Sequence, residues 1–233
     1  MKLLVIKMSK YKYTKQDAIK IVTSCAEQYE SELNGRQLLL LCTDKHKKIH
    51  TIELTFQSWH FLHLTGLKLV GRFKSESNSS ELTARDFYSR CLERKLSPED
   101  FDFSKDETSF KKLDVLPLVI CKNLHANAIG DFDKQRPRLM TDKLIGGVKA
   151  CIGFVRDSDQ YVPNTIIKED IRNVATNMLR IVAVFRKSII DNYYSEITYI
   201  AKQVDWSIIS FPEDYMAQKR IITESIHKDV VHR

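Results

Sequence analysis

Hydrophobic residues near the start of the chain recur every three to four positions, as they do on one face of a helix. The helix that this spacing predicts begins after Thr14, whose hydroxyl can cap its first turn, and runs to about Glu32. Its apolar stripe comprises Ala18, Val22, Cys25, Ala26, Tyr29 and Leu33. The apolar run 37–43 and the alternating segment 49–55 then predict two strands, which the charged turn between them joins into a hairpin.

Helical patterns return in the middle of the chain. The polar stretch 75–80 predicts a linker, and a helix is expected from Thr83 to about Lys95. Ser97-Pro98-Glu99-Asp100 has the order of a helix start, with a capping residue, a proline in the first turn and two acids. A further helix is expected over 108–123, kinked or broken near Pro117.

Later in the chain the apolar period shortens to two. The strands that this predicts cover 148–154, 161–167, 179–185 and 196–201, with a helical candidate only at 168–174. Strands that follow one another without long helices are typical of antiparallel sheets. We therefore expect an α+β fold in which N-terminal helices pack on a central antiparallel β-sheet, preceded by a helix–hairpin extension.

These patterns divide the chain into three parts. Residues 1–34 are expected to form an N-terminal helical extension, and residues 35–210 the α+β domain. Residues 211–233 form a polar, amphipathic tail that we expect to fray.

The composition is sufficient for a globular core, and it excludes several classes of protein. Of 233 residues, 43% are hydrophobic, but no run of 18 or more could span a membrane, and the first residues lack the pattern of a signal peptide. The five cysteines form no C-x-x-C pair, which argues against zinc and against a disulfide framework. We expect reduced thiols in a cytoplasmic protein, with no metal and no other cofactor.

The net charge of the chain points to nucleic acid as a candidate partner. A net charge of +7 is typical of proteins that bind RNA or DNA, although many basic proteins bind neither. The sequence contains no P-loop, G-x-G-x-x-G, H-E-x-x-H or G-x-S-x-G motif, so no common catalytic signature identifies the chemistry.

One histidine stands out within an apolar segment. His63 lies in Phe61-Leu62-His63-Leu64-Thr65-Gly66-Leu67, which predicts a short helix ending at Gly66. A histidine in such a place is either a hydrogen-bonded core residue or an imidazole held rigidly in a cleft. His60 lies three residues earlier, but the segment offers no further ligands for a metal site.

Cations on the later strands favour the functional interpretation. Lys149, Lys168, Arg172 and Arg186 interrupt or follow apolar stretches. Each of them could simply lie on a solvated outer face. Together with an imidazole they could instead form a positive cleft for metal-independent RNA cleavage, in which a base removes the 2′-OH proton, an acid protonates the leaving 5′-oxygen and cations stabilise the transition state.

Several blocks of the chain, in this order, resemble a known family. They are 61–67, Asp86-Phe87-Tyr88, 112–116, 151–155, 161–172 and 181–187. Over about residues 35–205 the chain is similar to the phage-associated Barnase–EndoU–colicin E5/D–RelE-like nucleases, type 4. The resemblance implies helices that lead into a central antiparallel sheet, and a small metal-independent ribonuclease, a class that includes many toxins.

The resemblance also implies roles for individual residues. It assigns His63 as the acid or base, with Lys168 and Arg186 as the other catalytic residues in contact with the phosphate. Thr65, Lys149, Tyr161 and Arg172 are the residues expected to bind substrate. The partner implied is RNA, with tRNA as one candidate, and a host protein or a cognate inhibitor is a second kind of partner.

A second hypothesis is that the domain binds without cleaving. It would then hold nucleic acid or a host protein as a phage counter-defence factor. A metal-dependent deaminase is a weaker alternative, because the sequence lacks its Cys and His ligand pattern.

Overall fold

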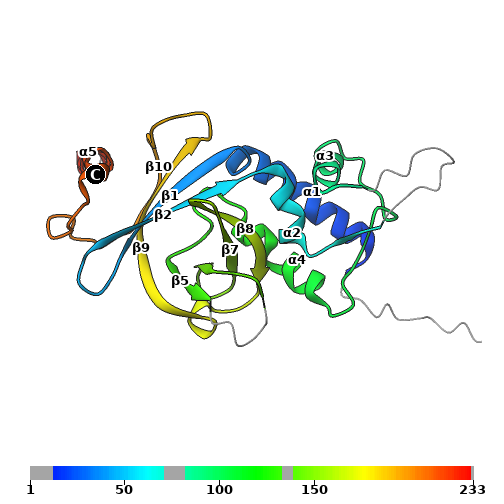
Figure 1. The fold of residues 1–233 in the computed structure, drawn as a ribbon. Coiled ribbons are helices and arrows are strands. Elements are labelled where there is room, and N and C mark those ends of the chain that lie inside the picture. The colour runs from blue at the N-terminus through cyan, green and yellow to red at the C-terminus, as the bar shows by residue number, and fades with distance from the viewer. Residues whose placement is uncertain (1–12, 71–81, 133–138, 232–233) are drawn as a thin grey trace, which may run out of the picture.

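The centre of the molecule is a closed β-barrel. The computed structural model describes residues 13–70, 82–132 and 139–231. Seven strands follow one another around the barrel in the order β1, β2, β8, β7, β6, β5 and β9, and β9 pairs with β1 to close it (Figure 1). All of these neighbours are antiparallel except β2 and β8, which are parallel and meet at Leu54 and Tyr161.

The strands of the barrel differ in length. They are β1 (Arg36–Thr43), β2 (Ile49–Phe56), β5 (Ala128–Phe132), β6 (Lys143–Gly146), β7 (Cys151–Asp157), β8 (Gln160–Ile167) and β9 (Ala175–Ser188). The first half of β9 pairs with β5, whereas its second half lies between β1 and β10 (Glu196–Ile200). A separate two-stranded sheet joins β3 (Lys68–Leu69) and β4 (Phe101–Asp102).

Four helices gather at one end of the barrel (Figure 1). They are α1 (Lys15–Glu32), α2 (Phe61–Thr65), α3 (Ala84–Leu92) and α4 (Thr108–Val119). The predicted first helix is confirmed: Thr14 caps it, and its apolar stripe is buried in the main core. Residues of α1, which the sequence predicts to be an N-terminal extension, share one core with the barrel.

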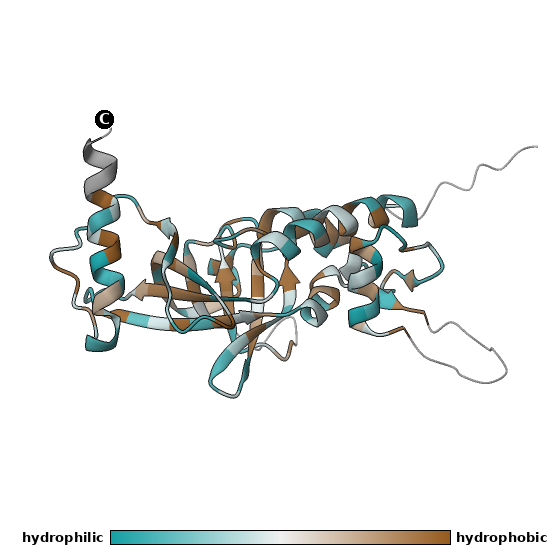
Figure 2. Ribbon diagram, turned by 90° about the horizontal axis from the view of Figure 1, so that it is seen from above, coloured by the Kyte–Doolittle hydropathy of each residue, from teal (hydrophilic) through white to brown (hydrophobic). Residues whose placement is uncertain are grey.

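The barrel wall formed by β1 and β9 is buried on both faces. Leu38 and Leu40 point into the main core, and Leu39 and Leu41 belong to a second core on the other face. The chain after β10, including α5 (Met216–Val231), covers this second core with Ile209 and Ile222. Figure 2 shows α5 at the far end of the molecule from α1 to α4. The tail is thus a docked helix where fraying was expected.

Two expectations about the sheet and one about a helix are wrong. The sheet is closed and contains one parallel pair, because alternation along a strand reports which face is buried and not which strand lies beside it. The short strands β5 and β6 were missed. Residues 97–100 form a turn, in which the Asp100 carboxylate accepts the Ser97 backbone N–H, and the chain continues as β4.

Smaller differences concern where elements end. The helix α4 contains Pro117 and stops at Val119, short of the expected residue 123. The helical candidate at 168–174 is reduced to a 3₁₀ turn, η2 (Ile171–Asn173). The linker predicted at 75–80 lies outside the described residues. No helix within the described ranges has both the length and the apolarity to cross a membrane.

Candidate active site

His63 is held at the surface by a short helix. Phe61 and Leu64 of α2 are fully buried, whereas His63 between them is exposed. Gly66 ends the helix with a φ of 69°, a left-handed conformation that glycine adopts without strain. The prediction of a short helix ending at this glycine is confirmed.

The end of α2 is fixed by side chains from α4. The Lys112 ammonium donates to the His63 carbonyl oxygen at 2.7 Å, and the Ser109 hydroxyl donates to the Gly66 carbonyl oxygen at 2.6 Å. Carbonyls at a helix end have no partner within the helix, so these bonds satisfy groups that would otherwise be buried unpaired. The His63 backbone is therefore rigid.

Burial keeps the imidazoles of this region neutral. Although the His63 side chain is exposed, its ring is partly desolvated by its neighbours, and this effect and the Lys112 charge lower the pKa of His63. Burial, together with the charge of His63, lowers the pKa of His60 to about 4, and burial lowers the pKa of the Lys112 ammonium to about 8. At neutral pH His63 is thus able to accept a proton.

The hydroxyl of Thr65 is occupied within the same turn. It donates to the Leu62 carbonyl at 2.8 Å, accepts the Leu67 backbone N–H at 3.1 Å, and is fully buried. Its observed contacts shape the turn that carries His63, and its predicted contact with substrate stays a prediction.

Three of the predicted cations lie in adjoining segments, which are the end of β8, the β6–β7 turn and η2. Lys168 follows β8, and its ammonium is 2.6 Å from the Asp114 carboxylate on α4. Lys149, which we expected within a strand, lies in the turn between β6 and β7, next to the position where β7 meets the end of β8. Arg172 lies in η2, and this turn is tied to the same β6–β7 turn by the bond from the Ile171 N–H to the Gly147 carbonyl at 3.0 Å.

These three cations differ in how they are paired. Arg172 forms an ion pair with Asp170 at 2.5 Å, and Lys168 is paired with Asp114. Lys149 is exposed and makes no ion pair with any described residue. Of the three, Lys149 therefore has the charge most available to a ligand.

Lys149 shares a pocket of about 190 Å³ with His125, for which the sequence predicts no role. The pocket, here called the His125 pocket, is lined by Leu118, Val119, His125, Asn127 and the turn residues Gly147, Val148, Lys149 and Ala150. His125, Asn127 and Lys149 thus line one hollow between the end of α4 and the β6–β7 turn. The sequence led us to expect an imidazole beside cations around His63, not around His125.

The backbone beside this pocket is strained. Leu124 and His125 both adopt left-handed conformations, with φ of 56° and 47°. The His125 N–H is held by the Asn123 side-chain oxygen at 3.3 Å. Such conformations cost about 1–3 kcal/mol each and cluster at functional sites. Asn123 and Asn127 flank this turn, but they do not by themselves signal its left-handed residues.

Arg186 and Tyr161 lie away from the His125 pocket. Arg186, on β9, is bound at 2.7 Å by both Glu32 at the end of α1 and Glu196 on β10, and these carboxylates raise its pKa. Tyr161 lies near the start of β8, at the opposite end of that strand from Lys168. The structure does not bring Arg186 together with Lys149 and Lys168.

Comparison with known proteins identifies the family of this chain. Residues 21–203 match the model of a family described as phage-Barnase-EndoU-ColicinE5/D-RelE like nuclease4, or PBECR4. The protein is a member of the PBECR4 family. The match begins within α1, earlier than the expected residue 35, and it includes both His63 and the His125 pocket. Comparisons with curated proteins and with solved structures found no match.

Membership in PBECR4 makes this a nuclease-like, phage-associated protein. Within the described ranges, no group of three or more His, Cys, Asp or Glu side chains is arranged to hold a metal ion. The five cysteines are free thiols, and burial raises the pKa of Cys25, Cys42, Cys91 and Cys151 to about 12.

Proposed function

We propose that this PBECR4 protein is a metal-independent endoribonuclease that cleaves RNA in the His125 pocket. The observation that carries the proposal is the shared pocket of His125, Asn127 and Lys149, beside a strained backbone, in a chain of a nuclease-like family. The proposal also places the enzyme in the cytoplasm of the bacterial host.

The proposed reaction uses the ribose 2′-OH as the nucleophile. The imidazole of His125 accepts the 2′-OH proton, O2′ forms a bond to phosphorus, and the bond from phosphorus to O5′ breaks. The Lys149 ammonium donates a proton to O5′, and the Asn127 amide stabilises the charge on the non-bridging oxygens. The products are a 2′,3′-cyclic phosphate and a 5′-OH end.

Within this proposal, His63 is the alternative acid or base, because the sequence predicts that role for it. The His63 side chain is exposed, but Lys112, whose charge lowers its pKa, is buried and bonded to the His63 carbonyl oxygen. Its other predicted catalytic partners, Lys168 and Arg186, are paired with carboxylates. The pocket around His125 has an unpaired lysine among the described residues, so we favour it.

The test is cleavage of total RNA and of tRNA by the purified protein in EDTA. His125→Ala and Lys149→Gln should each lower the cleavage rate by about 10²-fold or more. His46→Ala is the matched control, because His46 is exposed in the β1–β2 turn. An equal rate for wild type and His125→Ala would contradict the proposal, and a loss confined to His63→Ala would move the site to α2. Loss of wild-type activity in EDTA would contradict metal independence.

A second function is favoured by the ion pairs of the predicted cations. Lys168, Arg172 and Arg186 each contact a carboxylate, which leaves fewer cations for a phosphodiester. The domain could accordingly act as a silent module that binds nucleic acid or a host protein. RNA binding that weakens with salt, with the RNA recovered intact, is the result that would favour this alternative.

A further inference from the structure

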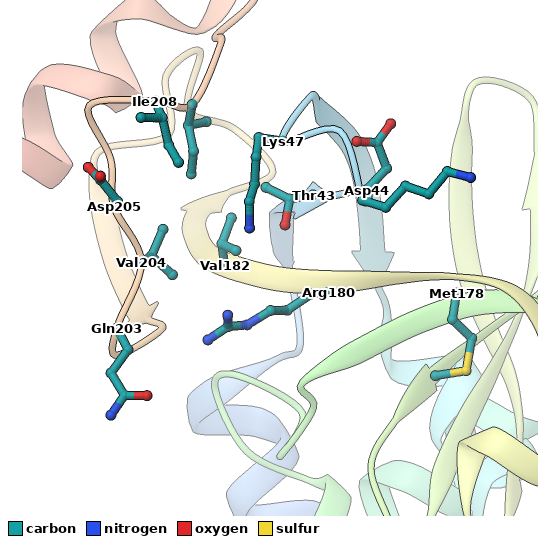
Figure 3. Close-up of a pocket in the computed structure, with 12 residues that line it drawn as sticks. Thr43, Asp44, Lys47, Met178, Arg180, Val182, Gln203, Val204, Asp205 and Ile208 are labelled. Carbon is teal, nitrogen blue, oxygen red and sulfur yellow. The ribbon is translucent and has the colours of Figure 1, made fainter.

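A larger cavity lies on another side of the barrel and shares no lining residue with the His125 pocket. It has a volume of about 410 Å³ and lies between the β1–β2 turn, the middle of β9 and the segment after β10 (Figure 3). Its lining residues are Thr43, Asp44, Lys45, Lys47, Met178, Arg180, Val182, Gln203, Val204, Asp205, Ile208 and Ile209.

Two cations extend into this cavity from different elements. Figure 3 shows the Lys47 side chain reaching from the β1–β2 turn toward Val182, and the Arg180 side chain reaching from β9 toward the segment that holds Gln203 and Val204. Arg180 is exposed and donates one of its five N–H groups to the Lys202 carbonyl at 3.1 Å. That bond fixes the guanidinium and leaves further donors for a ligand.

The two carboxylates of the cavity are already engaged. The Asp44 carboxylate accepts the backbone N–H groups of His46 and Lys48 and contacts the His50 ring at 3.1 Å, and these interactions lower its pKa to about 2. The Asp205 carboxylate accepts from the backbone and the hydroxyl of Ser207. Neither acid forms an ion pair with Lys45, Lys47 or Arg180 within the described part of the chain.

The turn that carries Lys47 is built to hold its shape. Besides the bonds to the Asp44 carboxylate, the Lys47 N–H donates to the Asp44 carbonyl oxygen at 3.2 Å, and Lys47 has a left-handed φ of 62°. An isolated bridge joins Lys48 to Ser210, so the turn is tied to the opposite wall of the cavity. The cations are therefore presented on a fixed frame.

The remaining wall is apolar and partly open to solvent. Val182 and Ile209 form a buried floor, while Met178 and Ile208 are 38% and 58% exposed. An exposed apolar surface beside unpaired cations suits a ligand that combines a negative charge with a flat hydrophobic ring.

We propose that this cavity binds a nucleotide, with its phosphate on Lys47 and Arg180 and its base against Val204 and Ile208. The nucleotide is either free or part of an RNA strand, since both present the same phosphate and base. The inference does not depend on cleavage in the His125 pocket, because none of the residues involved is shared.

Isothermal titration calorimetry of the full-length protein tests the proposal with three probes. They are AMP, inorganic phosphate and a 2′-O-methyl decanucleotide, which lacks the attacking hydroxyl and so stays intact whatever the nuclease activity. The variant is Lys47→Gln/Arg180→Gln. Its charge-matched control is Arg94→Gln/Lys95→Gln, since both of those cations are exposed just after α3 and pair with Glu27 of α1 and with Glu93. Thermal melting confirms that both variants fold.

We expect the cavity variant to lose at least tenfold in affinity and the control less than twofold. If the variant loses affinity for AMP, the ligand of the cavity is a free nucleotide. If it loses affinity only for the decanucleotide, the ligand is an RNA strand. Three results would overturn the proposal. One is that the cavity variant binds AMP and the decanucleotide as tightly as wild type, and another is that wild type binds neither of them. The third is phosphate binding as tight as that of AMP, because it would leave the apolar wall without a role.

Discussion

Around α2, burial lowers the pKa of individual side chains. His60, His63 and Lys112 lie close enough to influence one another, and desolvation is the largest cause of the lowered pKa in each case. His60 is the most instructive, because its Nδ1 accepts the Gln57 backbone N–H at 3.2 Å and can do so only when that nitrogen is unprotonated. The neutral ring is therefore part of the fold.

Acid should weaken the folded state through His60. Its pKa is lowered from 6.5 to about 4 on folding, so between these values the unfolded chain binds more protons and stability falls as the pH falls. From pH 7 to pH 5 this group should remove about 2 kcal/mol of unfolding free energy. Urea denaturation of wild type and His60→Gln checks this, because glutamine keeps an acceptor that does not titrate. Parallel pH profiles for the two proteins would contradict the assignment.

Gly66 should tolerate a side chain far less well than Gly35. Both have φ near +70°, at 69° and 67°, so alanine at either position is strained by about 1 kcal/mol. At Gly66 the added Cβ would also lie 2.8 Å from Lys112 Cδ and 3.3 Å from Ser109 Cα, whereas nothing lies within 4 Å at Gly35. We expect Gly66→Ala to cost about 2–4 kcal/mol. Equal unfolding free energies for the two variants would show that α2 and α4 do not meet as described.

Among the elements, β9 and α5 depart furthest from what their sequences suggest. The alternation over 179–185 correctly predicted a strand, but β9 is 14 residues long and pairs with three other strands. The amphipathic pattern of the tail predicted fraying, because nothing local indicates a surface for α5 to cover. That surface comes from Leu39 and Leu41 on β1, far away in the sequence.

Docking of α5 predicts a large effect of a single substitution. Ile222 is 1% exposed against the second core, so Ile222→Ala should lower the unfolding free energy by about 2–5 kcal/mol. Thr223→Ala, at an exposed position of the same helix, should change it by less than about 0.5 kcal/mol. Chemical denaturation distinguishes these outcomes. Two equally small effects would mean that the tail frays after all.

For the whole molecule, the sequence predicted most of the individual strands but not the closure of the sheet into a barrel. The hairpin of β1 and β2, the short helix before Gly66 and the strands β8 and β10 follow from local patterns, and the structure confirms them. The barrel depends on pairings between distant segments, such as Leu54 with Tyr161, which no local pattern encodes.

In the candidate site, too, some residues are signalled by local sequence patterns and others depend on contacts between distant segments. The sequence drew attention to Lys149, which lines the His125 pocket, because a cation beside an apolar strand is conspicuous. It drew none to His125, because the role of His125 depends on the turn that brings it next to Lys149 and on two left-handed residues that the sequence does not signal. Closure of the barrel places the β6–β7 turn against the end of α4 and thereby forms the pocket.

The most direct test of the account is the rate of RNA cleavage in EDTA by wild type, His125→Ala and His63→Ala, measured side by side. The account predicts that wild type and His63→Ala cleave at similar rates and that His125→Ala is slower by about 10²-fold or more. A fully active His125→Ala protein, with the fold intact by circular dichroism, would contradict it.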